Sequence, residues 1–444
     1  MPRNRSERLE HLLRNIFLVI AVLLVAYAAA FTNYLHAVGQ PPVQAKMIWL
    51  AGVAAIFFGV AAFRLPLTWK FRIFAVLLAL FFVEILLQAT AWLGVLPAVN
   101  TKIKVPYARI YWTSEGRGNG IRNRYGWYYP AFDLKASHRI VYIGDSQVEA
   151  LEVPRNRNQA ADLQALLKAK APDWSVLGMG NYGTCVAHSI EVLDYACRHF
   201  QPQEAVIVVS VGSDVTESSP KLVPVDHYIY YDFDASGRLV MDPACEPVRN
   251  QFNAELELCH RSVLITAPAI LNTHCMLLQL VDSLRDHYRL WKKQKEILAR
   301  GGGQMANGFF QPTFATDPSP DVQHAMQILF GQLQHCRDIC DQHGMKFRVV
   351  TIPAFPSAFY ETQHGTNWTT HLGEYDYSRP EREIAAWAHD HDVPVVAMGE
   401  VMRQKKLSAE EIHGLYYANG TGHLTPKGHA LVAQAVYDAW YAAP

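Results

Sequence analysis

The chain has 444 residues, and its 40 Lys and Arg residues balance 40 Asp and Glu residues. Zero net charge argues against a nucleic-acid-binding protein, for which an excess of basic residues is typical. The length allows two or three domains with sizeable cores. Half of the residues are hydrophobic and only 18% are charged, which indicates that membrane segments dilute an otherwise ordinary globular composition.

Three apolar stretches lie near the N-terminus, at residues 16–35, 47–63 and 73–96. Each approaches the ~20 residues that a helix needs to cross the hydrocarbon core of a bilayer. A cleaved signal peptide is the alternative for the first stretch, but the stretch is too long for the apolar region of a signal and two more follow it. We therefore expect residues 1–96 to form a membrane anchor of three transmembrane helices, with the lipid bilayer as a partner.

Basic residues gather at the N-terminus and in the second connection of this anchor: Arg3, Arg5, Arg8, Arg14, Arg64, Lys70 and Arg72. Such segments face the cytoplasm by the positive-inside rule. The N-terminus is then cytoplasmic, and the chain beyond the third stretch lies in the periplasm if the membrane is a bacterial inner membrane. Glu84 lies near the middle of the third stretch, where an ionisable group is either functional or a packing group hidden between helices.

Residues 97–137 form a linker and lead-in, after which short apolar runs alternate with amphipathic segments. The runs that we predict to be strands are 139–143, 175–179, 205–211, 346–352 and 393–397. The segments that we predict to be helices are 158–170, 184–200, 321–343, 382–391 and 426–441. Strands that alternate with helices at this spacing predict a parallel sheet covered on both faces. The expected fold class of residues 138–444 is therefore α/β, with three layers (α/β/α).

Residues 220–311 interrupt the alternation and are interpreted as an insertion beside the sheet. They contain an apparent hairpin at 228–231 and 239–241, an amphipathic helix near 275–298 and a glycine run at 301–303 that resembles a flexible joint. The insertion is a candidate for contact with the membrane surface, although a solvated helix face is the simpler interpretation.

The chain contains seven cysteines. Cys245 and Cys259 flank a loop of the insertion and are the best candidates for a disulfide. The cysteines do not show the spacing of zinc ligands. His389 and His391 point to different faces of a predicted helix end, which favours a solvated terminus over a metal site. We expect neither a metal nor a cofactor.

Candidate chemistry lies at three places along the predicted sheet. Ser146 ends the sequence Gly-Asp-Ser just after the first strand, where a parallel sheet presents its ligand crevice. His423 lies on a glycine-rich loop before the last helix and can take a proton from a serine hydroxyl. A glycine-rich segment that includes Gly180 and Gly183, and the pair Ser213 and Asp214 after the third strand, can supply hydrogen-bond donors to an oxyanion.

The order of these blocks is similar to that of the SGNH/GDSL hydrolase family, over roughly residues 118–440. The resemblance is closest to membrane-anchored bacterial members that are linked to acyl groups on cell-surface polysaccharides. It implies that Ser146 is the nucleophile, that His423 is the base and that the backbone N–H of Ser146 is one oxyanion donor. The second-block glycine matches Gly183, with Gly178 and Gly180 as alternatives.

Two positions depart from the family pattern. Ser213 replaces the third-block Asn, and Gly420 replaces the Asp that lies three residues before the His. Without that Asp, a backbone carbonyl or a carboxylate from elsewhere must orient His423, or the site is a Ser–His dyad.

Two functions remain open. One is a serine esterase or O-acyltransferase acting on acyl groups of extracytoplasmic glycans. The other is a catalytically inactive accessory subunit that binds a glycan or a membrane protein complex.

Overall fold

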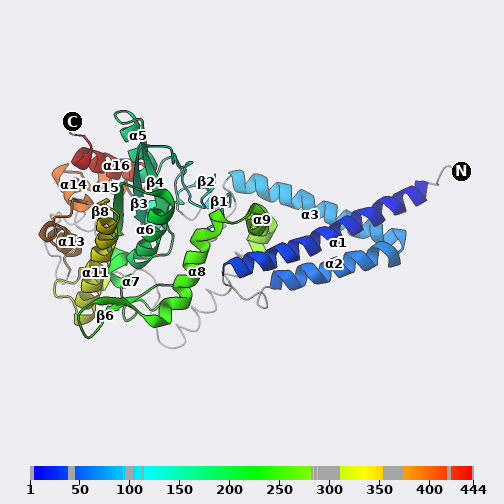
Figure 1. Ribbon diagram of the computed structural model, residues 1–444. Coiled ribbons are helices and arrows are strands. Elements are labelled where there is room, and N and C mark those ends of the chain that lie inside the picture. Colours follow the sequence, from blue (N-terminus) through cyan, green and yellow to red (C-terminus); the bar gives the residue numbers. More distant parts are fainter. Residues whose placement is uncertain are drawn as a thin grey trace.

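The computed structural model describes residues 5–38, 46–93, 95, 104–112, 115–281, 284, 288, 311–353, 375–417 and 422–442. An α/β domain lies at one end of the molecule, and three N-terminal helices extend away from it to the other end (Figure 1).

The N-terminal helices are α1 (Arg5–Ala37), α2 (Lys46–Arg64) and α3 (Leu67–Leu93). Within the described residues, α1 and α3 are long and apolar enough to cross a membrane, with windows of mean hydropathy 2.3 and 2.4. The apolar part of α2, Ile48–Arg64, falls short of that length. The expectation of three transmembrane helices is thus corrected to two candidate spans, which are compatible with a membrane anchor.

The helices of this bundle are arranged so that α1 and α3 begin at the same end. Nζ of Lys70, near the start of α3, lies 3.2 Å from Oε1 of Glu10, near the start of α1. Helix α2 packs along α1 and returns the chain to that end. Phe17 of α1 is fully buried against Ala61 and Ala62 of α2.

The central sheet of the α/β domain has five parallel strands in the order β4-β3-β5-β8-β9. They are β3 (His138–Gly144), β4 (Trp174–Gly180), β5 (Glu204–Ser210), β8 (Lys346–Ile352) and β9 (Val395–Ala397). The expected α/β class is confirmed. The strand order reverses direction between β3 and β5, and in such sheets a ligand crevice lies outside the carboxyl ends of the strands at this switch point.

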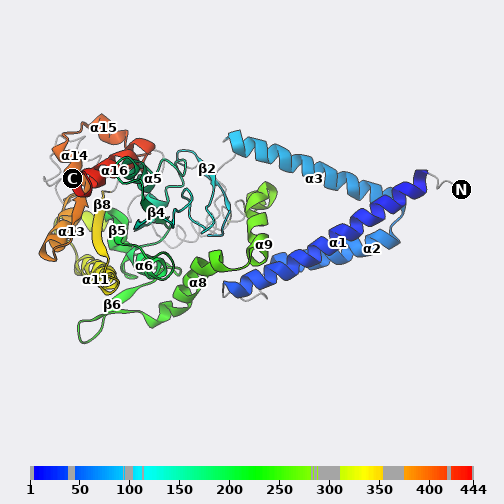
Figure 2. The same ribbon diagram turned by 45° about the horizontal axis from the view of Figure 1, so that its top comes forward.

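Helices cover both faces of the sheet (Figure 2). Helices α5 (Gln159–Lys168) and α16 (Pro426–Trp440) pack against each other, and α6 (Val186–Phe200) and α11 (Pro320–Gln342) form the other packed pair. Further helices of the α/β domain are α7 (Val211–Glu217), α13 (Arg379–Asp390), α14 (Met398–Gln404) and α15 (Ala409–His413). The predicted elements therefore occur where expected, with ends shifted by a few residues.

The insertion contains the predicted hairpin, as β6 (Tyr231–Phe233) and β7 (Leu239–Met241). It continues through η2 (Pro243–Cys245), α8 (Glu246–Leu256), η3 (Glu257–His260) and α9 (Val263–His274). The helix expected near 275–298 begins at Met276 and is described continuously only to residue 281, and the glycine run 301–303 lies outside the described residues.

The expected disulfide is wrong, because Cys245 and Cys259 are both free thiols. Sγ of Cys259 lies 3.0 Å from the hydroxyl oxygen of Tyr195, and the backbone N of Tyr230 donates to Sγ of Cys245 at 3.4 Å. The two cysteines sit at opposite ends of the η2–α8–η3 segment, and the rise of the intervening helix keeps them apart.

The insertion is attached to the membrane helices. Oη of Tyr27 in α1 donates to Oδ1 of Asn272 in α9 at 2.8 Å. The Glu84 carboxylate of α3 accepts from the backbone N–H groups of Met276 and Leu277, both at 2.8 Å. These N–H groups belong to the unpaired first turn of a helix. Glu84 therefore caps the helix that follows α9, in agreement with the interpretation of this half-buried acid as a packing group.

Candidate functional site

Ser146 begins the short helix α4 (Ser146–Glu149) directly after β3. Asp145 precedes it as the N-cap, and its Oδ1 accepts from the backbone N–H of Gln147 at 2.9 Å. As the first residue of a helix, Ser146 has no intrahelical acceptor for its own N–H. The sharp exit from β3 therefore presents both the hydroxyl and the N–H of Ser146 at the carboxyl end of the sheet.

His423 lies beside this serine although 277 positions separate them in the sequence. Its Nε2 is 2.9 Å from Oγ of Ser146. Gln147 ties the two loops together, because its Nε2 donates to the carbonyl of Gly422 at 3.3 Å and its Oε1 accepts from Leu424 N at 3.2 Å. The structure thus brings together the two residues that the sequence proposed as nucleophile and base.

Two glutamates occupy the other side of the His423 ring. Nδ1 of His423 lies 2.9 Å from Oε2 of Glu115 and 3.0 Å from Oε1 of Glu152. Both carboxylates are buried, with side chains 4% and 1% exposed. The site therefore has carboxylates to orient the imidazole, although Gly420 stands where the family has Asp. Gly420 itself lies outside the described residues.

Glu115 reaches His423 from the lead-in, which contains the antiparallel pair β1 (Arg109–Trp112) and β2 (Gly118–Ile121). The N–H of Arg117 donates to the carbonyl of Glu152 at 2.7 Å, which fixes the two acidic segments to each other. Gly116 has φ of +57° between them, and a methyl group there would lie 2.5 Å from the Glu152 carbonyl oxygen. Only glycine fits this turn without strain.

The two carboxylates control the protonation of His423. Burial alone would lower the pKa of the imidazole, but the charge of Glu152 and the hydrogen bonds and charge of Glu115 outweigh burial and raise it to about 10. At neutral pH the ring is therefore an imidazolium, and its Nε2 donates to Oγ of Ser146. The neutral ring, which can accept the serine proton, becomes populated as the pH rises.

The three glycines that compete for the second-block position have different surroundings. A methyl group on Gly178 would lie 2.5 Å from the Tyr129 ring, and one on Gly180 would lie 1.9 Å from the backbone N of Glu149. These two glycines let β4 pack closely against its neighbours. Gly183 has φ of +68° and open space at the Cβ position. It remains the candidate whose backbone can face a ligand.

A buried ion pair holds the loop that carries Gly183. Glu149 of α4 pairs with Arg122 at 2.6 Å, and both side chains are 1% exposed. The other oxygen of Glu149 accepts from the backbone N–H of Tyr182 at 2.5 Å. Burial raises the pKa of Glu149, but the charges of Arg122 and Lys104 outweigh it and lower the pKa below its usual range. Glu149 is thus ionised, and its contact with the Tyr182 N–H connects α4 to the glycine-rich loop.

Lys104 completes this support. Its Nζ donates to the carbonyl of Gly180 at 2.8 Å and to Oδ1 of Asn181, and it lies 4.3 Å from the centroid of the Trp127 ring. Burial lowers the pKa of this lysine to about 7. Sequence patterns did not single out Lys104, because its partners lie 76 and 77 positions away in the chain.

Ser213 and Asp214 lie on α7, at the carboxyl end of the strand next to β3. Oγ of Ser213 donates to the Ser210 carbonyl at 3.4 Å, within its own turn. Asp214 is 1% exposed, and its carboxylate accepts from Ser210 N at 2.7 Å. Burial and the nearby charge of Asp145 raise the pKa of Asp214 well above its usual range. Asp214 therefore supports the turn from a buried position, and its place in the substrate site stays a prediction.

No protein-family model matches the chain. No curated protein matches it either. Among solved structures, the chain is similar to TesA, with 12% identity and a TM-score of 0.33 over 68% of this chain and 98% of TesA. It is also similar to the acetyl xylan esterase AlAXEase, with 12% identity and a TM-score of 0.32 over 68% of this chain and 99% of that one. A third similar structure is a catalytic mutant of the acetylxylan esterase Axe2 from Geobacillus stearothermophilus. It has 12% identity and a TM-score of 0.33 over 68% of this chain and 94% of that one.

At identities and TM-scores this low, these structures carry no information about the chemistry of the site in this chain.

Proposed function

We propose that the chain is a membrane-anchored serine esterase or O-acyltransferase of the SGNH type, with Ser146 as nucleophile and His423 as base. The observation that carries this proposal is the 2.9 Å contact between Oγ of Ser146 and Nε2 of His423, on a ring whose Nδ1 faces Glu115 and Glu152. A nucleophile in contact with a base, and a base oriented by a third group, is the arrangement that activates a hydroxyl.

The reaction proceeds in two transfers. Oγ of Ser146 attacks the ester carbonyl while Nε2 of neutral His423 takes the hydroxyl proton, and the carboxylates of Glu115 and Glu152 stabilise the imidazolium that forms. The N–H groups of Ser146 and Gly183 and the hydroxyl of Ser213 are the proposed donors to the oxyanion. His423 returns the proton to the leaving alcohol. Water or a sugar hydroxyl then releases the acyl group from Ser146 by the reverse steps.

Two departures favour the inactive accessory subunit, Ser213 in place of Asn and Gly420 in place of Asp, and the structure bears on the second. Glu115 and Glu152 supply carboxylates at the same nitrogen of the imidazole, so that objection is removed. A glycan as acyl donor or acceptor, and membrane protein partners, remain parts of the proposal that follow from the family resemblance alone.

We also propose that the α/β domain lies outside the cytoplasm, in the periplasm of a bacterium. The ion pair between Lys70 and Glu10 sets the start of α3 beside the start of α1, at the end rich in basic residues. The proposal requires α2, whose apolar part is the shortest of the three, to cross back to that end, and α3 then leads from the basic end to the α/β domain at the other end (Figure 1). A membrane-impermeant maleimide tests this in whole cells, because Ser236→Cys in the exposed hairpin turn should be labelled without lysis.

Catalysis is tested on the detergent-solubilised full chain with a fluorophosphonate probe and a short-chain nitrophenyl ester. Wild type should be labelled and turn over, and Ser146→Ala should lose both signals. The matched control is Ser236→Ala, which changes a serine in the exposed turn between β6 and β7. It should keep both probe labelling and ester turnover. Wild type that is neither labelled nor active toward the ester would contradict the enzyme proposal.

Hydrolysis and transfer are separated by adding a series of unacetylated oligosaccharide acceptors, with free hydroxyls, to the same protein and nitrophenyl ester. A transferase releases nitrophenol faster in the presence of acceptor and forms an acylated sugar, whereas a hydrolase releases free acid at an unchanged rate. Mass spectrometry of the sugar distinguishes the two.

A further inference from the structure

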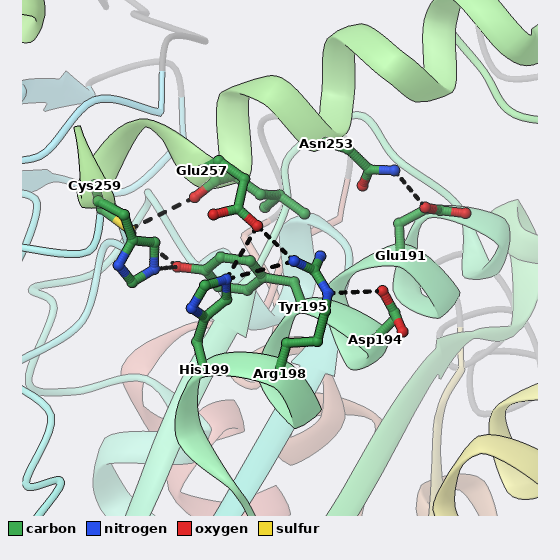
Figure 3. Close-up of polar contacts among 10 residues, drawn as sticks. Glu191, Asp194, Tyr195, Arg198, His199, Asn253, Glu257 and Cys259 are labelled. Carbon is green, nitrogen blue, oxygen red and sulfur yellow. Dashed lines mark hydrogen bonds and ion pairs between the residues drawn. The ribbon is translucent and has the colours of Figure 1, made fainter.

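Two histidines and one glutamate form a compact cluster between helix α6 and the insertion (Figure 3). His199 lies in the last turn of α6, while Glu257 and His260 lie on η3. One ligand atom from each of the three side chains lies within 4.8 Å of the other two. Nε2 of His199 is 3.0 Å from Oε1 of Glu257, and the two imidazole rings stack with their centroids 4.1 Å apart.

The geometry of η3 explains why Glu257 and His260 face the same way. Side chains three residues apart eclipse one another in a 3₁₀-helix, so these two residues project together toward α6. Leu258, between them, is 1% exposed in a separate apolar cluster with Tyr34 and Leu35 of α1. One side of η3 therefore contacts the α/β domain, and the other contacts the membrane anchor.

The donor set suits a late transition metal. Imidazole nitrogens favour zinc, copper and nickel over magnesium and calcium, which prefer oxygen alone. Two histidines and one carboxylate are an established ligand combination for zinc. Zinc bonds of ~2.0–2.1 Å place tetrahedral ligand atoms about 3.4 Å apart. The donor atoms already lie within 4.8 Å of each other, and ligation requires one of the two stacked rings to turn so that both nitrogens point at the same ion.

The surroundings of the cluster leave a path for an ion and orient one of the rings. The side chains of His199 and Glu257 are 25% and 27% exposed, which gives an ion access from solvent. The hydroxyl of Tyr195 lies 3.0 Å from Nε2 of His260 and orients the ring.

Arg198 competes with a metal ion for the carboxylate of Glu257. It donates to Oε1 of Glu257 at 2.7 Å, and also to Asp194 at 3.1 Å (Figure 3). Its side chain is 46% exposed. The contact with Asp194 can retain the guanidinium while Glu257 turns an oxygen to a metal ion, and Arg198 can then bond the second carboxylate oxygen.

We propose that His199, Glu257 and His260 form a zinc-binding site that fastens the insertion to the α/β domain. Water fills the remaining coordination position. The bound ion joins α6 to η3 next to α9, which contacts α1 through Asn272 and Tyr27. The site therefore fixes how the domain with Ser146 sits on its membrane anchor, and it operates whether or not Ser146 is catalytic.

The test measures zinc binding to the full chain in detergent, after chelator treatment and without a histidine tag. Competition with a fluorescent zinc chelator should give one equivalent per chain for wild type. His199→Ala and His260→Ala should each weaken binding by more than the ~10–100-fold typical of losing an outer-shell partner. His389→Ala removes a histidine that is 90% exposed beside Asp390 and should leave binding unchanged.

Two further measurements separate a metal site from a plain ion-pair cluster. Arg198→Ala frees Glu257, so zinc should bind as tightly as in wild type or more tightly, whereas an ion-pair cluster would only lose thermal stability. Cobalt should give the intense visible absorption of a tetrahedral site in wild type, a readout that does not depend on the variants folding. Substoichiometric zinc in wild type, wild-type affinity for zinc in both histidine variants, or the pale spectrum of hexaaqua cobalt in wild type would each overturn the proposal.

Discussion

Glu115 and His423 are 308 positions apart in the chain, yet Oε2 of the glutamate lies 2.9 Å from Nδ1 of the histidine. The acid arrives from the lead-in to the α/β domain, and Glu152 approaches the same nitrogen from the segment after α4. Two buried carboxylates on one imidazole stabilise its protonated form more strongly than one would. This arrangement has consequences for the pH dependence of Ser146.

The reactivity of Ser146 should rise with pH into the alkaline range. Glu152 and Glu115 raise the pKa of His423 to about 10, and the protonated ring cannot accept the serine proton. Below that pKa the neutral fraction grows about tenfold per pH unit. Fluorophosphonate labelling rates measured from pH 6 to pH 10 check this. A plateau reached near pH 7 would show that the ring titrates normally.

Glu152→Gln should move that profile to lower pH. Removing the carboxylate charge lowers the pKa of His423, so the neutral ring is populated earlier, while weaker stabilisation of the imidazolium lowers the maximum rate. Glu115→Gln should act in the same direction, and the two effects should not add, because either glutamate can hold Nδ1 alone. Glu410→Gln, at an exposed position of α15, is the control and should leave the profile unchanged.

The parts of the site that lie on local motifs could be predicted from the sequence. Ser146 follows a buried strand and His423 precedes a helix with Pro426 in its first turn, so their positions at the sheet edge followed from the chain around them. Glu115 and Glu152 carried no such signal, because nothing in their spacing relates them to His423. Their role depends on the β1–β2 pair packing against the segment after α4, through Leu151 and Glu152, which is a tertiary contact.

In the fold, too, the elements with a local sequence pattern could be predicted, and those that depend on tertiary contacts could not. The alternation of apolar runs and amphipathic segments predicted the five-stranded sheet, because burial imposes those patterns on each element separately. Helix α9 was missed, since its apolar sequence contains Pro268 within the helix, a residue that normally argues against one. Its contacts with α1 and α3 supply what the local sequence lacks.

Gly116→Ala should damage both stability and the site. The residue has φ of +57°, and a methyl group would lie 2.4 Å from the Tyr417 ring and 2.5 Å from the Glu152 carbonyl oxygen. A strained backbone of this kind costs ~1–3 kcal/mol, and the turn that places Glu115 must move. Gly414→Ala, whose nearest neighbours would be 3.4 Å away, is the matched control. Thermal unfolding and probe labelling measure the two effects, and equal behaviour of both variants would contradict the turn's role.

Breaking the ion pair between Arg122 and Glu149 should be strongly destabilising. Both side chains are 1% exposed, so Arg122→Met removes the cation paired with the buried Glu149 carboxylate and leaves it with the more distant charge of Lys104, at a cost of up to ~3–5 kcal/mol. Replacing both partners in Arg122→Met/Glu149→Leu should recover part of the loss, because the buried carboxylate is gone, although Lys104 then loses the charge of Glu149 beside it. The Tyr182 N–H nevertheless loses its acceptor, so labelling of Ser146 should stay below wild type even where the midpoint of thermal unfolding recovers.

Glu84→Ala should loosen the insertion from the membrane anchor without unfolding the sheet. The Glu84 carboxylate accepts from the backbone N–H groups of Met276 and Leu277 at 2.8 Å, and loss of a helix cap costs ~0.5–2 kcal/mol. Hydrogen exchange at these two amides should accelerate, while amides of β5, in the centre of the sheet, keep their protection. Glu84→Gln retains an acceptor oxygen but only one, so its exchange should be intermediate. Unchanged exchange in Glu84→Ala would mean that the helix after α9 is held by its other contacts, and that the carboxylate in α3 serves some other purpose.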